Sequence, residues 1–159
     1  SGVSALYVKS PNSSSYLSAG TSTTIASTAT NGLYSFYAKD KAGNISRTYF
    51  LYLDTVKPTG TIKNSNGTEI TGSYTNQTFS YSATDSGSGI SYLQYRKPGS
   101  SSWLTYTSGT SISASATSGT YQFRAIDNAW NISATKSITL DSSKPTMTLY
   151  SGDVSVSNG

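Results

Sequence analysis

Apolar and polar residues alternate along several short runs of the chain. In the run 77–84, Phe79, Tyr81 and Ala83 share one side of an extended strand, and hydroxyl side chains occupy most of the other side. The run 121–125 repeats the pattern, again with aromatic residues on one side. A period of two residues is typical of a β-strand with one buried and one exposed face, and no run shows the 3.6-residue period of an amphipathic helix. The pattern therefore predicts an all-β protein.

The same reasoning predicts seven strands between Pro58 and Lys144. They are expected at 59–64, 77–84, 90–96, 103–107, 111–116, 121–125 and 132–140. Turns separate them, as at 85–89, whose glycines accept a positive φ, and at 127–131, a tight connection. Seven short strands with a turn about every 8–12 residues favour an antiparallel β-sandwich. Its core is expected to hold Phe79, Tyr81, Ala83, Leu93, Tyr121, Phe123, Ala125 and Ile138.

The chain also repeats itself. Residues 1–62 align without a gap to residues 88–149, and 29 of these 62 positions are identical, so the two segments are copies of one unit. The period of 87 residues is too long for a solenoid repeat and suits a whole small domain. The chain is therefore interpreted as a segment of a tandem array.

Domain boundaries are expected at the two Lys-Pro pairs, because proline cannot continue the hydrogen-bond ladder of a sheet and stiffens the residue before it. This division gives a repeat at 1–57 that lacks its first two strands, a complete repeat at 58–144, and the first strand of a third repeat at 145–159. In the alternative, the first 84 residues fold as a permuted unit that later strands close.

Two motifs carry a resemblance to a known family. The run Gly-x-Tyr-x-Phe-x-Ala-x-Asp-x-Ala-x-Asn occurs at 32–44 and 119–131, and Leu-Asp-x-x-Lys-Pro-Thr follows at 53–59 and 140–146. Together they resemble the bacterial Ig-like domains of cell-surface and secreted proteins, mainly of Gram-positive bacteria. The resemblance implies tandem Ig-like or fibronectin-like antiparallel β-sandwiches, an extracellular location at the cell surface or in secreted form, and use as a stalk or spacer.

Four aromatic residues in these motifs are expected to be structural. Tyr34 and Tyr121 each lie two residues after a glycine at the start of a strand, which resembles a tyrosine corner, where the hydroxyl ties the preceding loop to the strand. Phe36 and Phe123 follow on the same strand face as core residues. Trp130 is different, since it stands where the first repeat has glycine. Two interpretations stay open: a contact to a neighbouring domain or ligand, or a lid over the end of its own domain.

Catalysis has few candidate groups in this chain. There is no histidine and no cysteine, which excludes Ser-His and Cys-His nucleophile systems. Four of the seven carboxylates form repeat-equivalent pairs, Asp40 with Asp127 and Asp54 with Asp141. A turn recurs in every repeat, whereas an active site has no need to. No enzymatic activity, catalytic residue or cofactor is therefore expected.

Calcium is the weaker alternative for the acidic residues. Hard oxygen ligands at domain joints would make a tandem array rigid. The candidate ligands are Asp54, Asp85, Asp127 and Asp141. Because no dense run such as Asp-x-Asp-x-Asp occurs, the expectation is that the fold needs no metal.

Charge and hydropathy argue against nucleic acid and a membrane as partners. The net charge of +4 is spread over both repeats without a basic cluster, which argues against nucleic acid, and no apolar stretch is long enough to span a membrane. The expected partners are neighbouring Ig-like repeats of the same protein, with a host glycan or protein as a further candidate. The incomplete first repeat would also accept a strand from 146–159 of another chain, so head-to-tail self-association into fibres is a hypothesis.

These expectations favour a non-enzymatic structural function. The chain is interpreted as a stalk or spacer segment of a bacterial extracellular surface protein, which projects a functional tip from the cell. Two alternatives remain: an adhesin module that binds a glycan or host protein, and an accessory domain of a secreted polysaccharide-degrading enzyme.

Overall fold

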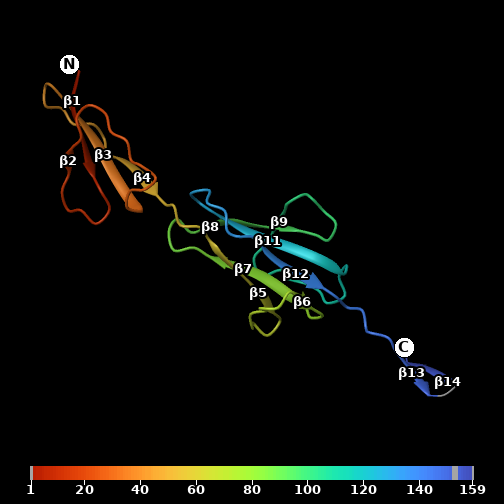
Figure 1. Cartoon of the computed structure of the whole chain (residues 1–159). Coiled ribbons are helices and arrows are strands. Elements are labelled where there is room, and N and C mark those ends of the chain that lie inside the picture. The colour runs from red at the N-terminus through yellow and green to blue at the C-terminus, as the bar shows by residue number, and fades with distance from the viewer. Residues whose placement is uncertain (1, 152–153, 159) are drawn as a thin grey trace.

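The computed structural model describes residues 2–151 and 154–158, with side chains for residues 2–148, and every regular element in them is a β-strand (Figure 1). The predicted all-β class is therefore confirmed. None of the described residues belongs to a helix that could cross a membrane.

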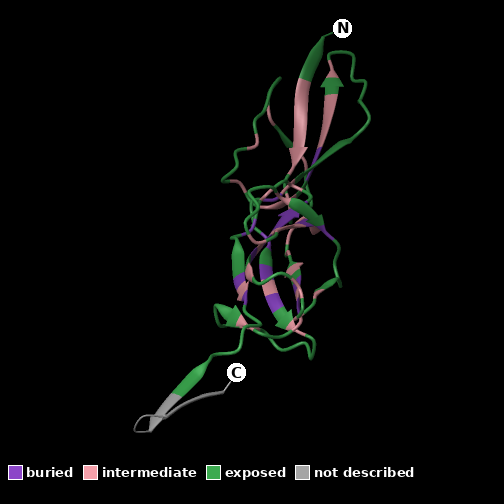
Figure 2. Ribbon diagram, turned by 90° about the vertical axis from the view of Figure 1, so that its right-hand side faces the viewer, coloured by how far each residue is buried: buried purple, intermediate pink, exposed green. Residues whose placement is uncertain are grey.

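The first four strands form one antiparallel sheet in the order β2-β1-β3-β4. Their bounds are β1 (Val3–Lys9), β2 (Leu17–Ser18), β3 (Gly32–Asp40) and β4 (Tyr49–Leu53). No other sheet of the described chain packs against this one, and most of its residues are partly or fully exposed (Figure 2). The first repeat is thus a single layer.

The next eight strands form two sheets, one of order β10-β7-β5 and one of order β6-β12-β11-β8-β9. Their bounds are β5 (Thr59–Asn64), β6 (Tyr74–Thr75), β7 (Phe79–Thr84), β8 (Ile90–Arg96), β9 (Leu104–Tyr106), β10 (Ser111–Ile112), β11 (Gly119–Asp127) and β12 (Lys136–Leu140). All neighbours are antiparallel except β6 and β12, which pair in parallel. The predicted count of seven strands misses β6, because its two residues pair only with β12, far along the chain, and carry no local signal.

The apolar faces of these two sheets meet in one core, which makes residues 58–144 a two-layer sandwich. The Phe123 ring lies at its centre, with no exposed surface, and stacks on Tyr81 at 5.0 Å between ring centroids. Seven of the eight predicted core residues are buried. The prediction is wrong for Ala83, which is half-buried because it lies near the end of β7, where the sandwich opens.

Two predicted strands, 59–64 and 90–96, agree with the structure residue for residue. The strand expected at 132–140 begins only at Lys136. The hydroxyl of Ser133 accepts the N–H of Ala125, so a side chain replaces the carbonyl of a regular ladder there. The pattern of apolar residues does not reveal this substitution.

β5 and β7 pack on β8, β11 and β12 rather than on the first sheet. This places Thr59–Asn64 and Phe79–Thr84 in the second unit, which is the arrangement expected from boundaries at the Lys-Pro pairs. After β12 the chain runs through an extended segment to a hairpin of β13 (Met147–Ser151) and β14 (Val154–Asn158). A single strand was expected from the sequence in this region.

Candidate functional site

The joint between the repeats, residues 54–58 between β4 and β5, is held by hydrogen bonds from two loops of the second repeat. Asp54 follows β4 and is only 6% exposed, although it belongs to the connection between two sheets. Its carboxylate accepts hydrogen bonds from the N–H of Val56 at 2.9 Å and of Ser88 at 2.6 Å. The side-chain amide of Asn131 donates to its backbone carbonyl at 3.0 Å. The end of the first repeat is thus bound to two loops of the second.

These contacts also control the charge of Asp54. Burial by itself would raise the pKa of this carboxyl, but hydrogen bonds from Ser88 and from the backbone of Val56 outweigh burial and leave the pKa below its ordinary value. Asp54 is therefore ionised at neutral pH.

Asp127 organises the loop after β11 and is fully buried. Its Oδ1 accepts the N–H groups of Ala129 and Asn131, and its Oδ2 accepts the side-chain amide of Asn131 at 2.8 Å. Asp40 makes the matching set of bonds in the first repeat, with Ala42 and Asn44. The recurring Asp-x-Ala-x-Asn segment is thus a loop held by its own aspartate.

Asp85 organises the loop between β7 and β8. Its Oδ2 accepts the N–H groups of Gly87 and Gly89, each at 2.9 Å. Its Oδ1 is buried and has no hydrogen-bond partner. A Cβ on Gly87 would lie 2.4 Å from the carboxyl carbon of Asp54, so only glycine lets the two loops approach this closely.

The three aspartates converge. One carboxylate oxygen from each of Asp54, Asp85 and Asp127 lies within 4.8 Å of the other two. At an effective dielectric constant near 20, two unit charges at 4.8 Å repel by roughly 3 kcal/mol. Three of the four calcium candidates named from the sequence therefore lie together, and among the described residues they form the group that could hold a metal ion.

Asp141 lies apart from this cluster. It is exposed, follows β12 as Asp54 follows β4, and accepts the N–H of Ser143 as Asp54 accepts that of Val56. Since Asp54 and Asp141 are repeat equivalents, Asp141 occupies the corresponding place at the end of the second repeat.

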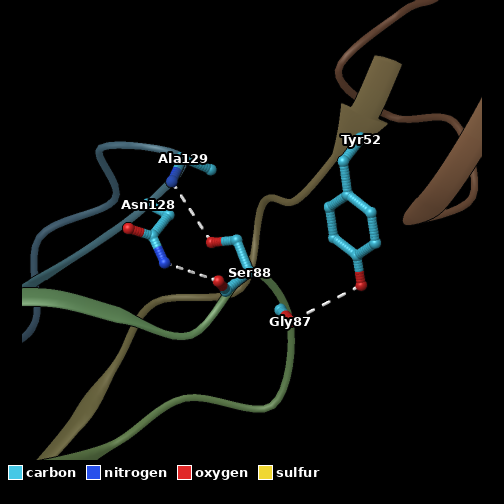
Figure 3. A pocket seen from close by; sticks show the side chains of 5 residues that line it. All are labelled: Tyr52, Gly87, Ser88, Asn128 and Ala129. Atoms are coloured by element: carbon cyan, nitrogen blue, oxygen red, sulfur yellow. Dashed lines mark hydrogen bonds between the residues drawn. The ribbon is translucent and has the colours of Figure 1, made fainter. Parts of the chain in front are cut away.

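A shallow pocket opens beside the joint (Figure 3). Tyr52 reaches from β4 toward the second repeat, where its hydroxyl donates to the carbonyl of Gly87 at 3.5 Å. On the far side, Asn128 donates to the carbonyl of Ser88, and the N–H of Ala129 donates to the Ser88 hydroxyl. The pocket is lined by groups that tie the repeats together and offers no convergent catalytic groups.

Trp130 lies in the same loop as Asp127 and is 72% exposed. Its φ is 69°, in the left-handed region, and Gly43 occupies the equivalent position of the first repeat with a φ of 93°. Its ring makes an edge contact with Tyr92, at 6.1 Å between centroids. The ring therefore leaves most of its surface in solvent.

The two tyrosines singled out from the sequence make equivalent bonds. The hydroxyl of Tyr34 donates to the carbonyl of Thr30 at 2.9 Å, and that of Tyr121 donates to Thr117 at 3.0 Å. In both repeats the hydroxyl holds the loop four residues upstream. Phe123 is fully buried, whereas Phe36 is only half-buried.

Sequence reasoning missed Asn131, Ser88 and Gly87, which complete the joint. For Asn131 a signal was present, because Asn44 recurs at the same repeat position. No protein-family model matches the chain, and no curated protein matches it.

Proposed function

We propose that this chain is a structural stalk or spacer segment of a bacterial extracellular surface protein, which projects a functional tip from the cell. The observation that carries the proposal is the joint. The carboxylate of Asp54 belongs to the first repeat, is buried, and accepts a hydrogen bond from the N–H of Ser88 in the second repeat. A connection of this kind resists bending.

Stiffness decides whether an array can act as a spacer. The span of flexible linkers grows only with about the square root of their length, whereas rigidly joined domains add their lengths. The connection between β4 and β5 is short and holds Pro58, and Asn131 from a loop of the second repeat anchors it by donating to the carbonyl of Asp54. Each added repeat then lengthens the array by about 40 Å, given about 3.3 Å per strand residue and a short linker.

The proposal includes no enzymatic role. The chain lacks the histidine and cysteine of the common nucleophile systems. The acidic residues at the joint accept hydrogen bonds from loop backbone, which is a structural use of a carboxylate.

Small-angle X-ray scattering tests the proposal. We expect the chain to have a rigid, elongated scattering profile, and Asp54→Ala to broaden its distribution of end-to-end distances. Asp141→Ala is the matched control, since it removes the same side chain at a repeat-equivalent position that lies outside the joint. A flexible profile for the unaltered chain would contradict the proposal.

A second candidate function, an adhesin module, draws on Trp130. A tryptophan that is 72% exposed and holds a left-handed backbone conformation is available for a glycan or protein ligand. Replacement by glycine, the residue at the equivalent Gly43, relieves the backbone and removes the ring. Loss of binding on a glycan or host-protein array in this variant would favour the adhesin over the stalk.

A further inference from the structure

We propose that the outer face of the β6-β12-β11-β8-β9 sheet binds an acidic polysaccharide, whose charged groups pair with Arg96 and Arg124. This face consists of the side chains of β8 and β11 that point away from the core, together with Trp103 and Trp130. The inference rests on the adhesin, the second candidate function above, and names the class of its ligand. The stalk function does not depend on it.

Strand alternation places these side chains on one face. Every second residue of β8 packs into the core, so Tyr92, Gln94 and Arg96 point outward. Arg124 of β11 lies opposite Gln94, and the ring of Trp130 makes its edge contact with Tyr92. The outer face thus carries both tryptophans of the chain and two of its three arginines.

The two guanidinium groups are fixed and uncompensated. Their central carbons lie 4.3 Å (Arg96) and 4.2 Å (Arg124) from the centroid of the Trp103 ring. Nε of Arg124 also donates to Oε1 of Gln94 at 2.8 Å. No carboxylate of the described residues forms an ion pair with either arginine. Stacking on an aromatic ring stabilises a guanidinium but leaves its charge, so two positive charges remain close together and complement an anion.

The hydrogen-bond donors of the two arginines are also available. Within the described part of the chain, the Nη groups of Arg96 and Arg124 donate to no other residue. Nε of Arg96 is buried without a partner, so packing on the Trp103 ring, rather than hydrogen bonding, holds this guanidinium in place. Two N–H groups of a guanidinium match the two oxygens of a carboxylate or a related oxyanion. The face therefore presents two preformed binding groups for anions.

A polysaccharide fits this face better than a peptide. An extended peptide binds a sheet at its edge, where backbone groups are unpaired, but β8 and β11 are inner strands of their sheet. Trp130 is mostly exposed and offers a flat apolar surface to a sugar ring. The outward side-chain amides of Gln94 and Gln122 can bond to sugar hydroxyls. A sugar chain with acidic groups makes all three kinds of contact.

The first repeat provides a comparison within the chain. Tyr37 and Lys9 stand where the second repeat has Arg124 and Arg96. The Lys9 amine lies 5.6 Å from the centroid of the Tyr16 ring. The first repeat thus keeps an aromatic outer face with one cation, whereas the second has two guanidinium groups. The preference for an acidic ligand is therefore assigned to the second repeat.

Tryptophan fluorescence tests the inference, because both tryptophans of the chain lie on the proposed face. The whole chain is titrated with polygalacturonate, dextran sulfate, neutral dextran and polyglutamate. We expect saturable binding of polygalacturonate or dextran sulfate, and the tighter of the two identifies carboxylate or sulfate as the preferred group. Polyglutamate should bind more weakly, and dextran should not bind.

Two variants of equal charge change locate the binding. Arg124→Gln should weaken binding by about tenfold or more, as expected for the loss of a charged hydrogen-bond donor. Lys63→Gln is the matched control, because Lys63 is exposed in β5 of the opposite sheet, and it should bind like the unaltered chain. Arg96→Gln provides a second variant if Arg124→Gln unfolds, which circular dichroism reports.

Three results would overturn the inference: no saturable binding of either acidic polysaccharide, equal losses in Arg124→Gln and Lys63→Gln, or polyglutamate binding as tightly as the polysaccharides. Equal losses would mean a general attraction of polyanions to a basic chain, and tight polyglutamate binding would mean an acidic peptide ligand. A ligand that Trp130→Gly loses and Arg124→Gln keeps would leave the adhesin and refute the acidic polysaccharide.

Discussion

The two repeats form the same sheet, but only in the second repeat does another sheet pack against it. β1 pairs with β3 in the register in which β8 pairs with β11: Val8 lies opposite Phe36, and Tyr95 opposite Phe123. Burial nevertheless differs, because β5 and β7 close only the second sheet. Leu51 of β4 is 47% exposed, whereas its equivalent Ile138 of β12 is 1% exposed. Alternation along a strand thus determines which side chains share a face, and a second layer determines whether that face is buried.

The largest expected effect concerns the matched phenylalanines. Replacing Phe123 by Ala should lower the free energy of unfolding of the second repeat by about 3–5 kcal/mol, as for other core aromatic residues. Phe36→Ala should cost clearly less, since its ring is only half-buried. Urea denaturation of both variants measures the difference. Equal losses of unfolding free energy in the two variants would mean that another layer packs on the first sheet in solution.

The second-largest effect is expected at Gly87, where two loops approach closely at the joint. Gly87→Ala should destabilise the docked joint by about 1–3 kcal/mol, because the new methyl group overlaps the carboxylate of Asp54. Gly72→Ala is the control, since its nearest atom would lie 3.8 Å away. Amide chemical shifts of Ser88 and Val56 report the joint. Unchanged shifts in Gly87→Ala would contradict the close approach.

A smaller effect depends on pH. The pKa of Asp54 is lowered in the folded chain, so its contribution to stability is present above the unfolded pKa of about 3.9 and is lost as pH falls through the folded value. In the presence of chelator, Asp54→Asn should flatten the fall in stability between about pH 5 and pH 2. Asp141→Asn should leave that fall as it is. Urea midpoints across this range measure both.

The smallest expected effect is self-association through the uncovered sheet. Tyr49 and Leu51, which share one face of β4, are 53% and 47% exposed, and such an apolar face attracts another chain. Light scattering should show a mass that rises with concentration, and less so for a version trimmed after Asp141, which lacks the β13–β14 hairpin. A strictly monomeric chain with an ordered first sheet would refute strand donation.

Much of the sandwich could be predicted from the sequence, because alternation is a local property. The strands Thr59–Asn64 and Ile90–Arg96 followed from it without error. β6 did not, because a two-residue parallel strand exists only through its partner β12, far along the chain. The repeat also shows why Asp141 could not join the cluster: it lies 87 residues after Asp54 and so belongs to the next joint.

The parallel pair of β6 and β12 has a consequence for force. β12 leaves the sandwich at the end opposite the first repeat (Figure 1), so a force applied between the two ends of the chain pulls β12 along its own axis. The N–H groups of Thr139 and Asp141 are bonded to the carbonyls of Ser73 and Thr75 across that axis. Such a force loads both bonds together in shear rather than breaking them one at a time. β6, the shortest strand of its sheet, therefore resists the removal of β12.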